Sequence, residues 1–246
     1  MKKLSLILLG ALAVTQAAQA APASFNGFYV GGQLGWTQRK DTTNIPAIQD
    51  TITGVPGGNV VIRNAALNKA KKANGLTYGI YSGYGQNNNG FYWGGEFSIE
   101  HTTANKNTTY AQEPTATQGA NTVKGSFNIN SKYERGVVFG ITPRIGAVIA
   151  NENLIYAKLG LEFSRDKATI GHTDVMFAGN KLQSASTSTK SKNQVVLVPR
   201  FGYERAFGNV LARAEYGYNV GGKIKSKDVS VKYTAHVVKF GLAYKF

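Results

Sequence analysis

The stretch HVVKFGLAYKF, residues His236–Phe246, alternates with a strict period of two residues. Apolar or aromatic side chains fill every second position, namely Val238, Phe240, Leu242, Tyr244 and Phe246. The residues between them are Val237, Lys239, Gly241, Ala243 and Lys245. This period is typical of a β-strand with one apolar face. The pattern therefore predicts a strand at the end of the chain, where many domains are frayed.

Seven earlier segments alternate in the same way and predict seven further strands. They are residues 26–38, 75–85, 91–101, 133–145, 155–163, 195–204 and 210–218. In the fourth segment, Tyr133, Val137 and Phe139 are assigned to one apolar face. No Pro/Gly/Ser linker divides the chain, so we expect a single all-β domain with an even number of strands.

The first twenty residues have the features of a secretory signal peptide. A basic start, Met1-Lys2-Lys3, precedes an apolar run from Leu4 to Val14 and the small-residue motif Ala18-Gln19-Ala20. This order predicts cleavage after Ala20, with a second candidate site after Ala23, and leaves residues 21–246 as the exported domain. No later segment approaches the roughly 18 consecutive apolar residues of a spanning helix. There are no cysteines, so disulfides do not stabilise the exported chain.

The connections between the predicted strands alternate in length. Three are tight and polar or contain glycine: Gln86–Gly90, Ala150–Asn153 and Ala206–Asn209. The others are mostly long, at about 40–74, 104–126, 166–193 and 221–229. Short turns on one side and long loops on the other are typical of outer-membrane barrels, whose closed sheet pairs every backbone polar group in lipid. We therefore predict an eight-stranded antiparallel up-and-down transmembrane β-barrel, with four extracellular loops and both termini in the periplasm.

The charged residues of the predicted strands fall on the polar face. They are Glu96, Glu100, Glu134, Arg144, Lys158, Glu162, Arg200, Glu204, Arg213, Glu215 and Lys239. A lysine or arginine that faces lipid at mid-bilayer costs about 2–4 kcal/mol, so this face should line the interior. Eight strands enclose a space that side chains roughly fill. Acids and bases can neutralise one another there, and we expect a lumen plugged by an ionic network.

The segment FNGFYVGGQLGW (Phe25–Trp36), together with the ending KFGLAYKF (Lys239–Phe246), resembles the small eight-stranded outer-membrane barrels. That group includes opacity-type surface antigens, the OmpA barrel and major surface proteins of α-proteobacteria. The resemblance implies a Gram-negative cell outer membrane and assembly by the barrel-insertion machinery. It also implies that Phe240, Tyr244 and Phe246 act as the insertion signal. It implies no enzymatic residues and no cofactor.

Three functions remain open on the sequence. The first is a structural surface protein whose loops interact with a host or the environment. The second is a narrow, low-conductance porin, because opposed inward charges can gate a small pore. The third is a receptor for haem or an adhesion target, with His172 as the haem candidate. His101, His172 and His236 are too dispersed to predict a metal site. No nucleophile, phosphate-binding or metalloprotease motif occurs, so we expect no enzymatic activity.

The charge is strongly basic, with 28 Lys and Arg against 13 Asp and Glu. Most of the excess lies in the four long connections, and the densest basic point is the loop patch Lys69, Lys71 and Lys72. An exported chain without a nucleic-acid-binding fold makes nucleic acid an implausible partner. We expect outer-membrane lipid and the phosphates and sugar acids of lipopolysaccharide as partners, followed by acidic host surface glycans. Solubility and mutual repulsion of the loops explain the charge equally well. We expect a monomer.

Overall fold

The computed structural model describes residues 25–53, 58–177, 180–226 and 229–246. The signal peptide expected at residues 1–20 lies outside these ranges. Among the described residues, no helix is long and apolar enough to span a membrane.

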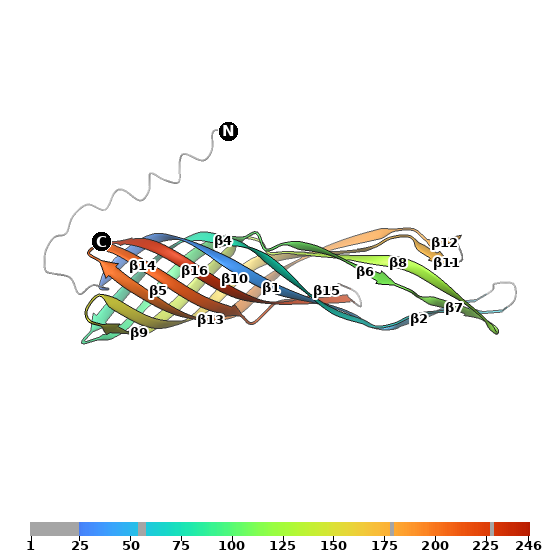
Figure 1. Ribbon diagram of the computed structural model, residues 1–246, viewed down its shortest axis with the longest axis horizontal. Helices are drawn as coiled ribbons and strands as arrows, with labels where there is room; N and C mark the ends of the chain where they lie inside the picture. Colours follow the sequence, from blue (N-terminus) through green and yellow to red (C-terminus); the bar gives the residue numbers. More distant parts are fainter. Residues whose placement is uncertain (1–24, 54–57, 178–179, 227–228) are drawn as a thin grey trace, which may run out of the picture.

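Eight long strands form a closed antiparallel ring (Figure 1). Neighbours around the ring follow the order β13-β14-β16-β1-β4-β5-β9-β10, and pairing of β10 with β13 closes it. The bounds are β1 (Gly27–Ile45), β4 (Leu67–Asn88), β5 (Phe91–Thr102), β9 (Val138–Ile149), β10 (Asn153–His172), β13 (Ser186–Phe207), β14 (Val210–Asn219) and β16 (Val229–Lys245). The eight-stranded antiparallel barrel predicted from the sequence is confirmed.

The first and last strands of the ring meet along a long seam. Leu34 of β1 pairs with Phe240 of β16, and Val30 pairs with Tyr244. The backbone N–H of Phe246 donates to the carbonyl oxygen of Phe28 at 2.9 Å. The ending of the chain is therefore held by the sheet on both sides, because β16 also pairs with β14.

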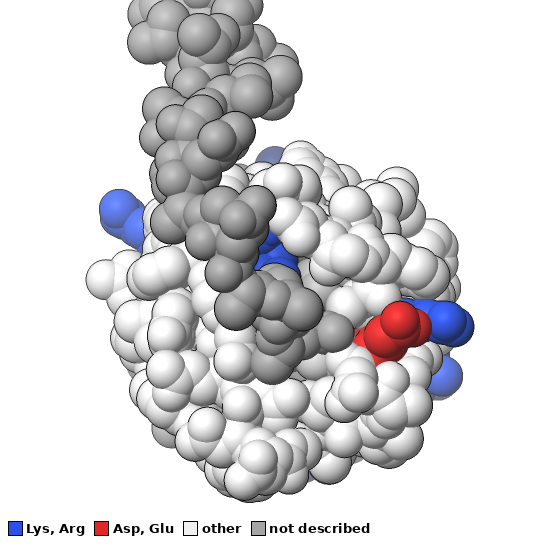
Figure 2. All heavy atoms as spheres, turned by 90° about the vertical axis from the view of Figure 1, so that its left-hand side faces the viewer, with Lys and Arg blue, Asp and Glu red and all other residues white. Residues whose placement is uncertain are grey.

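Three tight turns join strands at the end of the barrel where the chain terminates (Figure 1). Asn89 and Gly90 both have positive φ between β4 and β5. Ala150 and Asn151 both have positive φ between β9 and β10. Asn89 and Gly90 form a two-residue hairpin loop, and their positive φ values match the twist of the flanking strands. The β9–β10 turn has three residues, because Ile149 pairs with Asn153. Figure 2 views this end, and most of its visible surface belongs to uncharged side chains.

The barrel strands alternate between an apolar outer wall and a polar interior. Exposed residues on the outer face include Leu34, Ile80, Ile141, Leu159 and Leu197. Aromatic side chains mark both edges of this wall. Phe28, Tyr84, Phe91, Trp93, Phe207, Tyr244 and Phe246 lie at the tight-turn end, and Trp36, Tyr78, Tyr216 and Tyr218 lie at the other. An apolar wall between two aromatic girdles is the surface that a membrane-spanning barrel presents to lipid.

The fourth predicted strand is wrong in one respect. Residues 133–145 do not form one strand, because β8 (Asn121–Glu134) ends before Arg135 and β9 begins at Val138. The break changes the alternation, so Tyr133 faces inward and is 1% exposed while Phe139 faces outward. The sequence pattern placed Tyr133 and Phe139 on one face because it continued the two-residue alternation across the break between β8 and β9.

The long connections are built largely of strands, which differs from the loops expected there. The barrel strands β1, β4, β10, β13 and β16 continue beyond the apolar wall into an extension, which shorter strands complete by pairing with β10 and β16 (Figure 1). These shorter strands are β2 (Ile48–Ile52), β3 (Val60–Asn64), β6 (Lys106–Gln112), β7 (Thr115–Gln118), β8, β11 (Val175–Phe177), β12 (Asn180–Gln183) and β15 (Lys223–Ser226). Alternating Thr, Ser, Asn and Lys residues carry no apolar strand signal but still pair through the backbone. Residues 54–57, 178–179 and 227–228 of these connections lie outside the described ranges.

A small apolar core supports the extension. Ile45, Leu67, Tyr110 and Ile129 pack together, each at most 7% exposed, with Phe127 and Ile170 against them. These residues come from β1, β4, β6, β8 and β10. The extension is therefore a packed continuation of the barrel wall, because its strands share a core.

Candidate functional site: the closed lumen and the extension

The barrel interior contains ten of the eleven charged residues expected there. Glu96, Glu100, Arg144, Lys158, Glu162, Arg200, Glu204, Arg213, Glu215 and Lys239 are each at most 7% exposed. The eleventh, Glu134, does not lie in the lumen as expected. It is about one-third exposed and forms an ion pair with Lys132 at 2.7 Å, because it ends β8 just before the break at Arg135.

Glu96 is the centre of the network. Its Oε2 accepts a hydrogen bond from Arg213 Nη1 at 2.6 Å, and its Oε1 accepts one from Lys158 Nζ at 2.9 Å. Arg144 Nη1 lies 3.6 Å from Oε2, and the Tyr29 hydroxyl donates to the same oxygen at 3.2 Å. β5, which carries Glu96, and β14, which carries Arg213, stand on opposite sides of the ring. This ion pair therefore crosses the full width of the lumen.

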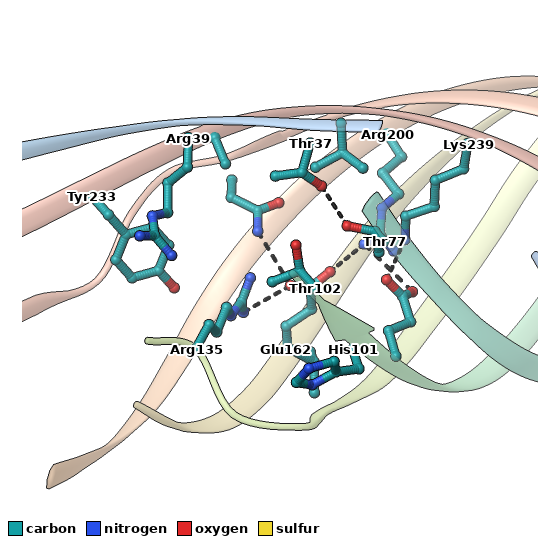
Figure 3. Close-up of a pocket in the computed structure, with 15 residues that line it drawn as sticks. Thr37, Arg39, Thr77, His101, Thr102, Arg135, Glu162, Arg200, Tyr233 and Lys239 are labelled. Atoms are coloured by element: carbon teal, nitrogen blue, oxygen red, sulfur yellow. Dashed lines mark hydrogen bonds and ion pairs between the residues drawn. The ribbon is translucent and has the colours of Figure 1, made fainter. Parts of the chain in front are cut away.

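A second level of ion pairs lies nearer the extension (Figure 3). Lys239 Nζ donates to Glu100 Oε2 at 2.5 Å, and Arg135 Nη2 donates to Glu162 Oε2 at 2.9 Å. Arg200 donates to the other oxygen of Glu162. Figure 3 shows Arg135 and Arg200 approaching Glu162 from two sides. Each carboxylate here is held by at least one cation, which is the arrangement that makes buried charges tolerable.

Tyrosines and Arg144 fill the end of the lumen near the tight turns. The Arg144 guanidinium carbon lies 4.1 Å from the ring centroid of Tyr156 and 5.3 Å from that of Tyr92. Its Nη2 lies 3.3 Å from Glu204 Oε1, and its Nη1 donates to the Tyr29 hydroxyl at 2.8 Å. A cation over aromatic faces in a desolvated site adds to the attraction of the ion pair.

Glycines in neighbouring strands provide the space for these rings. Tyr156 stands opposite Gly202, and a Cβ on that glycine would lie 2.3 Å from Tyr156 Cζ. Tyr29 stands opposite Gly83, where a Cβ would lie 2.3 Å from the tyrosine oxygen. Each ring thus lies flat across a strand position that has no side chain.

A further cluster closes the lumen where the extension begins. Arg39 Nη2 donates to Asp41 Oδ2 at 2.8 Å and to the carbonyl oxygen of Tyr133 at 3.0 Å. The Tyr133 hydroxyl donates to Asp166, and its ring centroid lies 4.9 Å from that of Tyr233. Burial raises the pKa of Asp41, and the neighbouring Arg39 opposes that rise. Burial also raises the pKa of Tyr233 to about 12, so its hydroxyl keeps its proton near neutral pH.

The space left between these side chains is small. The cavity lined by Arg39, Glu100, Arg135, Arg200 and Lys239 has a volume of about 30 Å³ (Figure 3). One water molecule needs at least about 10–15 Å³ measured in this way. The cavity therefore has room for very few waters.

Several lumen residues were missed by the sequence reasoning. Arg39, Arg135 and Asp166 are buried and charged, and Tyr29, Tyr81, Tyr92, Tyr133, Tyr156 and Tyr233 are buried inside the barrel. Tyr29, Tyr81, Tyr92 and Tyr156 stand opposite glycines in a neighbouring strand, and that signal requires the strand register. Arg39 and Asp166 lie at or near the limits of the predicted loops.

The three histidines are separate in space as well as in sequence. His236 Nδ1 and the Tyr216 hydroxyl are hydrogen-bonded at 2.6 Å on the outer wall. The His101 ring lies against Tyr78, and His172 Nδ1 lies 2.9 Å from the carbonyl oxygen of Thr173. Within the described ranges, no group of three or more His, Cys, Asp or Glu could hold a metal ion.

The basic loop patch occupies two faces of one strand. Lys69, Lys71 and Lys72 are all exposed on the extension end of β4. Lys72 shares the outward face of Leu76, whereas Lys69 and Lys71 lie on the opposite face, because side chains alternate along a strand. The three lysines therefore do not form one compact patch.

The residues expected to signal insertion lie together on the outer wall. Phe240 is 64% exposed, and Tyr244 and Phe246 are also exposed, with their ring centroids 5.3 Å apart. Tyr244 and Phe246 form part of the aromatic girdle at the tight-turn end, whereas Phe240 lies further along the wall, opposite Leu34. Their role in insertion stays a prediction.

A closed antiparallel barrel with an apolar outer wall, two aromatic girdles and an ionic interior defines the class of transmembrane outer-membrane barrels. Comparison with protein families agrees with this class. The family model described as outer membrane protein beta-barrel domain matches residues 4–246. The chain belongs to this family, and the cell outer membrane is its location.

Several solved structures are similar to this chain. The protease OmpT from Escherichia coli is 7% identical, with a TM-score of 0.44, covering 94% of this chain and 99% of that chain. Neisserial surface protein A is 16% identical, with a TM-score of 0.38, covering 93% and 100%. Ail of Yersinia pestis, solved with the heparin analogue sucrose octasulfate, is 16% identical, with a TM-score of 0.31, covering 87% and 99%. Comparison with curated proteins found no match.

Proposed function

We propose that this protein is a surface-exposed barrel with a structural role in the envelope, and that its extension interacts with a host or the environment. The observation that carries the structural role is the Glu96–Arg213 ion pair at 2.6 Å across the lumen. Lys158 and Arg144 reinforce it from two other strands. An interior blocked in this way supports a wall-forming role over a transport role.

The arrangement of the two ends supports an orientation. The tight turns and both ends of the barrel sequence lie at one end, and the extension lies at the other (Figure 1). Outer-membrane barrels place short turns in the periplasm and long segments outside. We therefore place the termini in the periplasm and the extension outside the cell.

The interior chemistry supports a protein without enzymatic activity. The carboxylates of Glu96, Glu100 and Glu162 each contact a lysine or arginine within 3 Å. A general base needs access to substrate. These carboxylates are buried in a lumen whose cavity is about 30 Å³, and no substrate of ordinary size fits there.

Conductance across a planar lipid bilayer tests the closed lumen. The refolded full chain should show no stable open level at moderate voltage. A reproducible open level in the wild type would contradict the proposal and favour the narrow porin. A variant with both Glu96→Ser and Arg213→Ser serves as a positive control for detection, because it removes the bond across the lumen.

Binding to host cells and acidic glycans tests the interaction role. One variant replaces residues 46–66 and 107–132 with short turns, which joins the paired residues Ile45 and Leu67 and the paired residues Lys106 and Tyr133. It removes β2, β3, β7 and nearly all of β6 and β8 while keeping the eight barrel strands. It should insert normally but lose binding. A variant that inserts and binds as the wild type does would reject the interaction role of the extension.

A further inference from the structure

Four lysines form a row on the outward face of the barrel wall, where the extension begins. Lys40 of β1 pairs directly with Lys72 of β4, and Lys223 of β15 pairs directly with Lys232 of β16. Lys232 pairs with Thr42, two residues from Lys40, so the two lysine pairs are diagonal neighbours across the β1–β16 seam. The row crosses four adjacent strands, and all four side chains are exposed.

No acidic side chain neutralises the positive charge of this row among the described residues. Like charges directly opposite each other on a sheet are destabilising, and this row contains two such pairs. The nearby carboxylate of Asp41 is turned to the other face, where Arg39 Nε lies 2.7 Å from its Oδ1. Among the described residues, no ion pair involves Lys40, Lys72, Lys223 or Lys232. A ligand with several negative charges would relieve the repulsion.

The height of the row suits the headgroup region of a membrane. Lys40 lies four residues beyond Trp36, which belongs to the aromatic girdle, and Lys72 lies four residues beyond Leu76. Four residues span about 13 Å along a strand, or about 10 Å of height at the tilt of a barrel strand. Lysine side chains extend toward the interface from such positions. The four ammonium groups therefore lie where phosphates of the outer leaflet are found.

An apolar hollow lies below the row on β1, β4 and β16, with β14 at its margin. It has a volume of about 800 Å³, and its outward lining includes Gly32, Leu34, Tyr78, Ile80, Phe240 and Leu242. Gly32 leaves the wall open, because a Cβ there would meet only the Gly79 carbonyl oxygen at 3.9 Å. From Gly32 to Lys40 is eight residues, or about 20 Å of height at the same tilt. An acyl chain attached to a headgroup at the lysine row would reach this hollow.

We propose that the outer wall at β15, β16, β1 and β4 is a binding site for a phosphorylated glycolipid of the outer leaflet. The four lysines bind its phosphates, and the hollow at Gly32 accommodates one of its acyl chains. The hollow favours a lipid over a soluble polyanion as the ligand, because a soluble polyanion has no acyl chain to fill it. The proposal holds whether or not the extension binds a host.

The experiment measures lipid binding by the folded full chain in a zwitterionic detergent. The probe is lipopolysaccharide without O-antigen, compared with the same lipid after enzymatic dephosphorylation. Binding is followed by titration and by native mass spectrometry. The quadruple variant Lys40→Gln, Lys72→Gln, Lys223→Gln and Lys232→Gln should bind about tenfold more weakly or worse, because each lysine near an anionic surface contributes about fivefold. Dephosphorylation should weaken binding to the wild type and leave the variant little changed.

A matched variant controls for net charge. Lys69→Gln, Lys71→Gln, Lys124→Gln and Lys190→Gln remove four exposed charges elsewhere on the extension. This variant should stay within about twofold of the wild type. An equal loss in both quadruple variants, or no loss in the first, would overturn the proposal.

A second pair of variants tests the hollow without changing charge. Gly32→Leu fills it and should weaken binding, whereas Gly95→Leu, on the outward face of β5 with nothing within 4 Å, should not. Equal binding by both would reject the acyl site. The same four variants are titrated with a soluble sulfated oligosaccharide. If the lysine row is needed for that ligand and not for the glycolipid, the site is one for a soluble polyanion and the proposal fails.

Discussion

Arg213 on β14 and Glu96 on β5 are joined at 2.6 Å between Nη1 and Oε2, across the whole width of the barrel. The two strands are four places apart in a ring of eight. This ion pair links opposite walls of the barrel, whereas backbone hydrogen bonds link only neighbouring strands. It links the charged residues of the lumen into a brace between opposite walls of the barrel.

Glu96→Gln should lower the free energy of unfolding by about 3–5 kcal/mol, because it leaves Arg213 and Lys158 buried with less negative charge beside them. The measurement is urea unfolding in lipid vesicles, followed by tryptophan fluorescence. Glu152→Gln is the control, since Glu152 and Arg205 lie 3.7 Å apart and are about half exposed. That pair should contribute about 0–1 kcal/mol. Similar losses in both variants would contradict the central role of Glu96.

Gly202→Ala should destabilise the barrel by about 1–3 kcal/mol, because its methyl group would overlap the Tyr156 ring and force the ring to move. Gly95→Ala is the control, because nothing lies within 4 Å of its added methyl. Unfolding temperature on a heat-modifiable gel gives a first comparison, and urea titration gives the free energy. The Tyr156 hydroxyl donates to Glu215 Oε1 at 2.6 Å. A stable Gly202→Ala barrel that keeps this hydrogen bond would show that the ring does not need the glycine.

Ala150→Gly should stabilise the protein by about 0.5–1 kcal/mol. Ala150 has φ of 50° in the turn between β9 and β10, where an L-residue is strained and glycine is not. Ala147→Gly, in the regular part of β9, should have the opposite sign, because glycine weakens a strand interior. Both are measured by urea unfolding. A loss of stability in Ala150→Gly would show that the positive φ carries no strain.

Leu159→Arg should cost about 2–4 kcal/mol when the barrel is in lipid, whereas Phe207→Arg should cost about 0–1 kcal/mol. Leu159 lies in the middle of the outer wall, and Phe207 lies beside a tight turn at its edge. The depth dependence is the diagnostic quantity, so both variants are unfolded from vesicles of the same lipid. Equal costs at the two depths would mean that the apolar wall is not the lipid face.

The Glu96–Arg213 bond illustrates the division between sequence and structure. Alternation assigned both residues to the polar face, and the cost of a charge in lipid placed that face inside the barrel. The alternation could not pair them, because 117 positions separate them in the chain. Their meeting depends on the order of strands around the ring and on the register of each ladder.

The break at Arg135–Val137 and the extension show where local patterns fail. One period carried across the break placed Tyr133 on the wrong face. Much of the extension, such as β6 and the first residues of β13, is rich in Thr, Ser, Asn and Lys, so no apolar period marks it. The pairing of its strands is decided by the barrel strands that continue into it and by the small core of Ile45, Leu67, Tyr110 and Ile129.

The sequence by itself determined the class of fold, the number of barrel strands and the inner and outer faces, because all three follow from a two-residue period and the cost of burying charge in lipid. The ending HVVKFGLAYKF already contained the outward aromatic row and the inward Lys239. Only the tertiary structure decided that Lys239 meets Glu100 and that Lys40, Lys72, Lys223 and Lys232 form one row. Those contacts depend on register, which backbone pairing sets across strands far apart in the chain.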